Sequence, residues 1–254
     1  MRFEGKTVYI TGASSGIGAQ LARELAGRGA AVGLLARREE RLTELTEELT
    51  AAGHTAAWRE ADVTDREALH AACDGLAADL GEPDVAIANA GWNRTEPMSR
   101  FQPGKALAIY DTNLLGFLHL VDWVLPRFLE RGAGHLVGVA SLASYVGFPG
   151  NAAYCGSKAA MRVHLQSLRP SLKRRGIAVT TLCPGFIESE LTAKNPYKMP
   201  FLWKTDRACR YMADAIEKER GEVAFPWQMR IAVPFLLARV LPRALVERLV
   251  GRAG

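Results

Sequence analysis

Residues 7–18 read Thr7-Val8-Tyr9-Ile10-Thr11-Gly12-Ala13-Ser14-Ser15-Gly16-Ile17-Gly18, a short apolar strand followed directly by a glycine-rich turn. Ile17, Leu21 and Leu25 repeat at helical spacing, so the turn opens a helix. In this context glycines let the backbone turn tightly and approach a pyrophosphate, which the helix N-terminus stabilises electrostatically. An ordinary turn is the alternative. We predict a dinucleotide site that contains Gly12, Ser14, Ser15, Gly16, Ile17 and Gly18.

Apolar strands and helices alternate along the rest of the chain. After the first strand at 7–10, strands are predicted at 31–36, 55–58, 85–88, 135–140, 177–182 and 223–225. Helices are predicted at 39–50, 65–80, 103–131 (with an irregularity near Asn113) and from before Tyr154 to residue 175. The strands are apolar almost throughout, which is typical of a parallel sheet covered on both faces. We predict an α/β fold with a doubly wound parallel sheet, as one domain over 1–254 with a helical tail at 226–254.

Composition excludes several other classes of protein. The 254 residues are 48% hydrophobic, enough for a large core without disulfides or metals. Four widely spaced cysteines and five histidines show no ligand spacing, so no metal site is predicted. The net charge of +5 comes from scattered arginines without interleaved aromatics, so no nucleic-acid partner is expected. The chain begins without a signal-peptide pattern, which favours a reduced, cytoplasmic protein.

The residues after the second strand indicate which cofactor is bound. An NAD enzyme usually places an acidic residue there for the ribose hydroxyls, but this chain reads Leu35-Ala36-Arg37-Arg38. Because planar guanidinium groups pair well with phosphate, we predict NADP, with NADPH preferred over NADH. Arg37 is the stronger candidate and Arg38 the weaker; the alternative is that both begin a solvated helix.

Polar residues follow several of the predicted strands. Asp62, Asn89, Ser141 and Pro184 should therefore meet at one edge of the sheet, where ligands of such folds bind. Asp62 is expected to accept a hydrogen bond from the adenine amino group. Its alternative role is capping the next helix, an N-cap that Thr64 could serve equally well.

Tyr154 and Lys158 stand four residues apart on a predicted helix and so share one face. A free phenol ionises at about pH 10, too high for proton exchange at neutral pH, and a neighbouring ammonium lowers that pKa. In isolation the pair would be an ordinary surface contact. Here the pair occurs in a sequence that also has polar residues after its strands and a glycine-rich turn. We therefore consider it a candidate catalytic pair.

Taken together, these motifs resemble the short-chain dehydrogenase/reductase family, in its compact single-domain branch with a Rossmann-like fold, over about residues 5–225. Asp62-Val63 and Asn89-Ala90-Gly91 resemble its adenine-side and strand-four motifs. Asn113, Ser141, Tyr154 and Lys158 match its catalytic tetrad. Pro184, Gly185, Ile187 and Ser189 resemble the segment that contacts nicotinamide, with Ser189 where the family often has threonine.

The resemblance implies reversible hydride transfer between NADP and a secondary alcohol or ketone. Tyr154 would be the general acid and base, and Ser141 would bind the substrate oxygen. Lys158 would lower the Tyr154 pKa and bind the nicotinamide ribose, while Asn113 would anchor a water. Ser144 is an alternative to Ser141. A catalytically silent NADP-sensing or scaffold protein is the alternative function.

The segment at 186–208 corresponds to a flap over the substrate in this family. It is rich in aromatic and apolar side chains, which suit a bulky, poorly polar substrate. The alternative is packing between flap and body. The residues in question are Phe186, Tyr197, Met199, Phe201, Leu202 and Trp203, with Trp92 and Phe148 as further candidates for the pocket wall.

The tail at 226–254 departs from the family pattern, in which the C-terminus often contributes to a tetramer. A homodimer and a homotetramer both remain open. Pro234 and Pro242 predict first turns of two short helices. The apolar stretch at 231–241 is too short and interrupted to span a bilayer. Flanking arginines (Arg230, Arg239, Arg243, Arg248 and Arg252) would suit a helix on an anionic membrane surface. We favour instead a cap over the pocket or a dimer contact.

Overall fold

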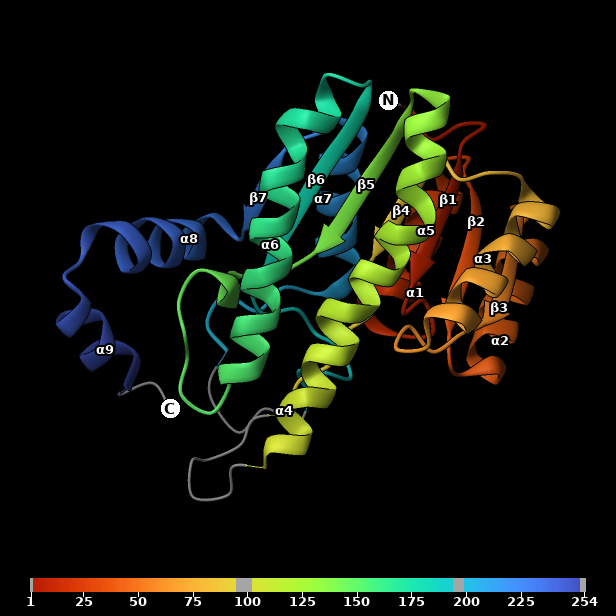
Figure 1. Cartoon of the computed structure of the whole chain (residues 1–254). Helices are drawn as coiled ribbons and strands as arrows, with labels where there is room; N and C mark the ends of the chain where they lie inside the picture. Colours follow the sequence, from red (N-terminus) through yellow and green to blue (C-terminus); the bar gives the residue numbers. More distant parts are fainter. Residues whose placement is uncertain (1, 95–101, 194–198, 252–254) are drawn as a thin grey trace.

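The computed structural model describes residues 2–94, 102–193 and 199–251. Its described strands form one parallel sheet in the order β3-β2-β1-β4-β5-β6-β7 (Figure 1). The strands are β1 Thr7–Thr11, β2 Ala31–Ala36, β3 Ala56–Glu60, β4 Val85–Ala88, β5 Gly134–Val139, β6 Ile177–Pro184 and β7 Glu222–Phe225. The strand order reverses between β1 and β4, which places a topological switch point beside the glycine turn. This confirms the predicted doubly wound, Rossmann-like α/β fold.

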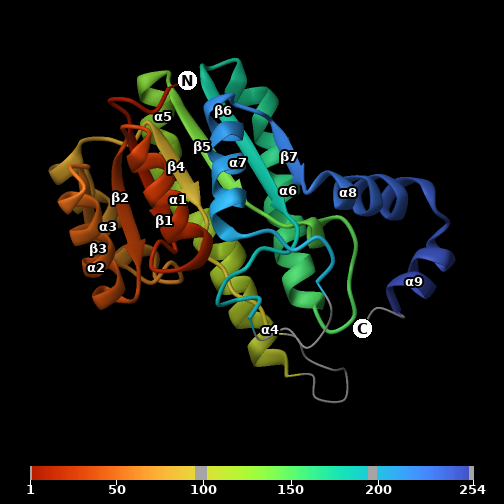
Figure 2. The same ribbon diagram turned by 180° about the vertical axis from the view of Figure 1, so that it is seen from behind.

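Helices cover both faces of the sheet. On one face lie α1 Gly16–Gly27, α2 Glu39–Ala51 and α7 Thr205–Glu217; on the other lie α3 Arg66–Leu80, α5 Gly116–Arg131 and α6 Ala152–Lys173 (Figures 1 and 2). Where bounds were predicted for these helices, they agree to within two residues, whereas no helix was predicted at the position of α7. One capping prediction is wrong: Asp65, not Thr64, is the N-cap of α3, and its carboxylate accepts from the Ala68 amide.

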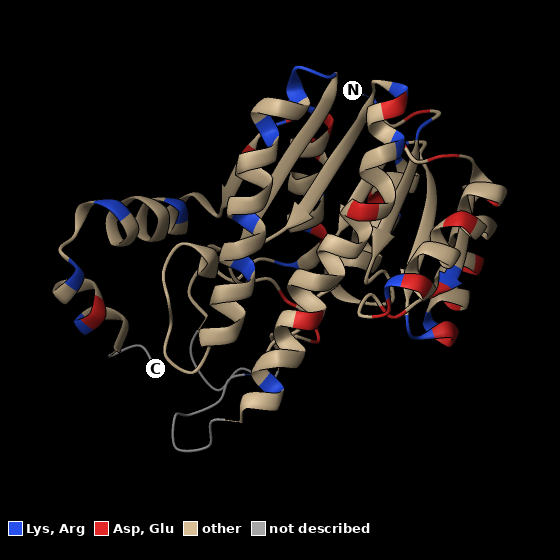
Figure 3. Ribbon diagram, in the orientation of Figure 1, with Lys and Arg blue, Asp and Glu red and all other residues tan. Residues whose placement is uncertain are grey.

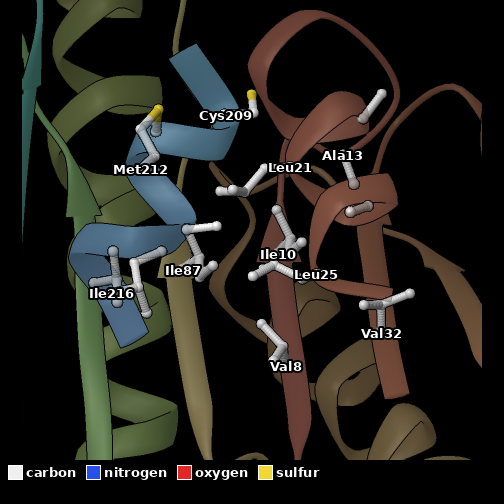
Figure 4. Close-up of a cluster of buried hydrophobic side chains, with 14 of the residues drawn as sticks. Val8, Ile10, Ala13, Leu21, Leu25, Val32, Ile87, Cys209, Met212 and Ile216 are labelled. Carbon is white, nitrogen blue, oxygen red and sulfur yellow. The ribbon is translucent and has the colours of Figure 1, made fainter. Parts of the chain in front are cut away.

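Each face has its own apolar core. Val8 and Ile10 of β1 pack with Leu21 and Leu25 of α1, and Met212 of α7 closes the same cluster (Figure 4). These side chains are fully buried. Alternate residues of β1 point to opposite faces, so Tyr9 belongs to the second core, where it stacks on Trp123 of α5. Because both cores pack against the same sheet, they hold in place the strand ends that carry the polar residues.

The long helix predicted at 103–131 is interrupted where the sequence indicated. It comprises α4 Pro103–Tyr110, a π-helical turn η2 at Asp111–Leu115, and α5. Turns of this kind interrupt the regular ladder and are frequent at functional sites. Asn113 lies in the middle of η2 and is fully buried.

The chain ends in a helical arm that extends away from the sheet beyond β7 (Figures 1 and 2). We call residues 227–251 the C-terminal arm; it comprises α8 Trp227–Arg230, a π-helical segment η4 Ile231–Val240, and α9 Arg243–Gly251. Pro234 lies inside η4 rather than in a first turn, so that prediction is wrong, whereas Pro242 directly precedes α9. Within the described ranges, no helix is both long and apolar enough to cross a membrane.

Candidate active site

The glycine turn is held against the end of β4 by close backbone contact. A Cβ on Gly18 would lie 2.2 Å from the Gly12 carbonyl oxygen, and one on Gly12 would lie 2.7 Å from Ala90 Cα. Gly12 also has a φ of +67°, in the left-handed region. The Asn89 side-chain amide donates to the carbonyl oxygens of Thr11 and Gly12, at 2.9 and 3.2 Å. Asn89 therefore shapes the turn, and the partly buried Ile17 packs against the core below it.

Two arginines follow β2 directly, and one of them, Arg38, contacts the turn. Arg38 Nε donates to Ser14 Oγ at 3.1 Å, and its terminal nitrogens contact Ser15 Oγ and, at 3.0 Å, a carboxylate oxygen of Glu190. The Arg37 side chain is 71% exposed and lies 3.4 Å from Asp62. Sequence reasoning ranked Arg38 below Arg37, yet Arg38 makes more contacts with the turn. The Arg38 guanidinium therefore lies against the turn, whereas the Arg37 guanidinium lies beside Asp62.

Asp62 is held by the turn that follows β3. One carboxylate oxygen accepts from the backbone N–H and the hydroxyl of Thr64, and the other faces Arg37. Burial by itself would raise the pKa of Asp62, but the Thr64 hydrogen bonds and the Arg37 charge outweigh it and lower the pKa. The neighbouring Val63 is buried, and its carbonyl oxygen accepts from His119.

A cavity of about 700 Å³ opens at this end of the site. Trp92 lines it, and the indole N–H lies within hydrogen-bond distance of the Ala108 carbonyl and the Thr112 hydroxyl. Trp92 was expected in the substrate wall, whereas the structure places it in the same cavity as Arg37 and Asp62. Its contacts cross from the end of β4 to α4 and η2, which no local sequence signal indicates. The lining residues are Arg37, Asp62, Thr64, Trp92, Ala108, Asp111, Thr112 and Leu115.

Asn113 joins the end of β4 to α6. Its Oδ1 accepts from the Trp92 backbone N–H at 2.9 Å, and its Nδ2 donates to the Trp92 carbonyl and to Ser157 Oγ, each at 3.1 Å. A Cβ on Gly91 would lie 3.0 Å from Asn113 Oδ1 and 3.2 Å from Lys158 Nζ. Asn113 and Lys158 therefore flank the Gly91 backbone from the same side.

Lys158 is buried one helical turn after Tyr154 on α6. Its ammonium donates to the Val139 carbonyl at the end of β5, at 2.7 Å. Burial disfavours the charged form and lowers the Lys158 pKa from 10.5 to about 8, a shift that the Cys183 thiol only partly opposes. A buried lysine without a carboxylate counter-ion among the described residues is costly, and such groups concentrate at functional sites. Ser157, between the two, accepts from Asn113 and donates to the Tyr154 carbonyl.

Ser141 lies at the end of β5 and caps a short 3₁₀ turn, η3 Leu142–Ser144, that packs against α6. Its Oγ accepts from the Ala143 amide at 3.1 Å, which leaves its own O–H able to donate. Ser144 is also buried, on the same turn. Cys155 is buried and its pKa is raised by that burial, which fits the predicted packing role.

The segment after β6 runs beside the glycine turn. The Gly185 amide donates to the Phe225 carbonyl at 2.7 Å. Ile187 is buried and pairs with Trp203 as an isolated strand-like bridge. Ser189 lies against the turn, because a Cβ on Gly16 would be 3.3 Å from Ser189 Cβ. The predicted nicotinamide segment, Pro184 included, thus lies at the same sheet edge as the turn.

The flap side chains divide between core and surface. Trp203 packs on Tyr211 and Phe225, with ring centroids 5.8 and 5.5 Å apart, as the packing alternative predicted. Phe201 and Leu202 are 53% and 38% exposed. The prediction for Tyr197 lies outside the described residues.

Comparison with known proteins agrees with this arrangement. The family model described as short chain dehydrogenase matches residues 6–199. An oxidoreductase of Myxococcus xanthus is 42% identical over 247 residues, which cover 97% of each chain. Among solved structures, a gluconate 5-dehydrogenase from Burkholderia cenocepacia in complex with NADP and tartrate is 28% identical, with a TM-score of 0.83 over 91% of this chain and 98% of that one. A variant of actinorhodin polyketide ketoreductase with NADPH is 26% identical, with a TM-score of 0.81 over 88% and 97%.

Proposed function

The chain belongs to the short-chain dehydrogenase family, and from this membership we propose that it transfers a hydride between NADP(H) and a secondary alcohol or ketone. The observation that carries the proposal is the buried Lys158 ammonium, one turn after Tyr154 and beside Asn113. Burying an ammonium group costs free energy. That cost is explained if the ammonium lowers the pKa of a group that takes part in the reaction.

The residues around the glycine turn fit a dinucleotide with a 2′-phosphate. The first turn of α1 carries no acidic side chain, so its N–H groups suit an anion. Arg38 and Ser14 supply a cation and a hydroxyl at that turn, and Arg37 supplies a second, exposed cation directly after β2. Ala36 supplies no carboxylate that could bond a ribose in their place. This supports NADPH over NADH, as does the NADP or NADPH in the two similar structures.

The proton of the reaction is handled by this chain's own side chains. When bound, the nicotinamide ring supplies the hydride chemistry. In the reductive direction Tyr154 donates its phenolic proton to the carbonyl oxygen, and in oxidation it takes the proton back. Lys158 stabilises the phenolate, Ser141 donates a hydrogen bond to the same oxygen, and Asn113 holds the segment after β4 against α6.

The exposed apolar side chains of the flap support a bulky, poorly polar substrate. Leu191, Phe201 and Leu202 are all at least 38% exposed beside the nicotinamide segment. An apolar lining with a few oriented polar groups is the usual composition of a small-molecule site.

The proposal is tested with a panel of ketones and aldehydes, following NADPH by its absorbance. Tyr154→Phe should lower turnover by about 10²–10⁴-fold, the usual contribution of a positioned acid–base group, and leave NADPH affinity unchanged. Cys155→Ala, a change at the next residue, is the matched control and should retain turnover. NADPH binding without turnover of any carbonyl would favour the silent, sensing protein. Turnover like that of the wild type in Tyr154→Phe would refute the mechanism.

The proposal includes a cytoplasmic homodimer or homotetramer. Leu107 on α4 and Val163 on α6 are 63% and 52% exposed, and α4 and α6 lie against each other. Exposed apolar side chains on two adjacent helices suit contact between copies. Size-exclusion chromatography with light scattering measures the state.

A further inference from the structure

The C-terminal arm leaves large apolar side chains uncovered. Trp227 is 66% exposed, Phe235 55% and Val240 54%. Ile231, Leu236, Leu245 and Leu249 are also exposed, at 46%, 38%, 39% and 43%. Such a concentration of exposed apolar residues in 25 residues marks an interaction surface. The cap predicted from sequence would have buried these side chains against this chain's own body, and the structure does not bury them.

The exposed residues of η4 share one face. In a π-helical segment, residues four and five apart lie above one another, which aligns Ile231, Phe235 with Leu236, and Val240. Val233 falls on the opposite side and is 5% exposed. The apolar stripe therefore points away from the side of η4 that is packed.

The arm is also strongly basic. Arg230, Arg239, Arg243 and Arg248 are all exposed, and Glu247 is the one acidic residue in the sequence from 227 to 251 (Figure 3). Across the described part of the chain, no ion pair engages these four arginines. Their charge is thus available to an external anionic surface.

The first turn of the arm is anchored on the body. A Cβ on Gly185 would lie 2.9 Å from Met229 Sδ and 3.2 Å from Leu142. The Arg230 amide donates to the Pro226 carbonyl, which continues the helix directly from the end of β7. The arm is therefore attached beside the nicotinamide segment rather than through a loose linker.

We propose that the C-terminal arm lies in the plane of an anionic phospholipid surface. Its exposed stripe would enter the headgroup boundary while the flanking arginines bind lipid phosphates, the combination that defines interfacial helices. A second copy fits less well, because a symmetric contact would bring two arms of the same positive charge together. The proposal is independent of the reaction assigned above.

The test is flotation of the full-length protein with extruded vesicles of phosphatidylcholine alone or mixed with phosphatidylglycerol. We expect flotation with the anionic vesicles only, weakened by added salt, because surface charge is screened over about 10 Å at 0.1 M. NADPH affinity and circular dichroism are measured on every variant, so that loss of fold is not mistaken for loss of binding.

Paired substitutions separate the two components of binding. Arg239→Glu with Arg243→Glu should lower partitioning by at least tenfold, since each arginine near such a surface contributes a factor of about five. Phe235→Ser with Val240→Ser should lower partitioning onto the vesicles without changing the charge of the protein. Arg174→Glu with Arg175→Glu, at the exposed end of α6, makes the same charge change outside the arm and should retain binding.

Three results would overturn the proposal. The first is a wild-type protein that does not float with anionic vesicles, and the second is a control pair that loses as much binding as the arm pair. The third is a dimer that Phe235→Ser with Val240→Ser converts to a monomer in light scattering without any vesicle binding, which would assign the stripe to a second copy.

Discussion

The glycine turn and the C-terminal arm differ in where their side chains find contacts. Around the turn, Asn89, Thr11 and Arg38 bond to neighbouring elements, and Gly18 leaves no room for a methyl group. In the arm, apolar side chains and arginines face outward, and Gly251 has no atom within 4 Å of an added Cβ. The turn is complete within this chain. The exposed stripe of the arm gains contacts only from another surface.

This difference separates residues whose changes should alter the folded enzyme from those whose changes should not. A buried group perturbs both its partners and the fold when it is replaced. Replacing an exposed group changes only the binding of a ligand or surface that contacts it. The three predictions below each pair a change at the site with a matched change in the arm.

The largest effect is expected for Gly18→Ala. The new methyl would lie 2.2 Å from the Gly12 carbonyl oxygen and 2.6 Å from Asn89 Nδ2, so backbone atoms must move. We expect a loss of about 3 kcal/mol in the free energy of unfolding, at the upper end for overpacking, and at least tenfold weaker NADPH binding. Urea denaturation and fluorescence titration measure the two. Gly251→Ala should change neither the free energy of unfolding nor the affinity for NADPH. Equal effects of the two substitutions would contradict the difference between the turn and the arm.

Arg37→Ala is expected to act on the cofactor alone. A hydrogen bond to a charged group is worth about 1.5–3 kcal/mol, so NADPH affinity should fall by about 10–100-fold. NADH, which lacks the 2′-phosphate, should bind as before. Arg239→Ala removes an exposed arginine from the arm and should change neither dissociation constant. A parallel loss for both cofactors in Arg37→Ala would show that Arg37 supports the fold instead.

The smallest change in free energy, and one of opposite sign, is expected for the unfolding of cofactor-free Lys158→Met. The Lys158 pKa of about 8 lies below its usual 10.5, so between these values the unfolded chain binds the proton more tightly than the folded one. The buried charge therefore costs stability below pH 8, and that cost fades as the pH rises toward about 10.5.

Lys158→Met should accordingly raise the free energy of unfolding by about 1–2 kcal/mol at pH 7 while abolishing turnover. The gain should shrink at pH 10, as measured by urea denaturation at both pH values. Arg243→Met, at an exposed arginine of the arm, should change stability at neither pH. A less stable Lys158→Met protein at pH 7 would contradict the interpretation that the ammonium is held at a cost.

Much of the fold could be predicted because its signals are local. The strand and helix bounds that were predicted agree to within two residues, since buried parallel strands and amphipathic helices repeat with different periods. The helix α7 was missed, although its apolar residues also repeat at helical spacing. The irregularity at Asn113 was also predicted and is confirmed as η2. The capping of α3 by Asp65 was missed, because Thr64 and Asp65 both suit an N-cap and only the backbone geometry selects one.

The sequence by itself determined the sheet, the glycine turn and which residues are candidates for chemistry, because these depend on periodicity, residue type and spacing along the chain. Only the tertiary structure decided which partners those residues have. Trp92 lines a cavity with Arg37, and Arg38 reaches both the turn and Glu190. The tertiary structure also decided that the apolar stripe of the arm stays exposed. A sequence shows that one face of a helix is apolar, but it does not show whether the protein's own core or another surface covers that face.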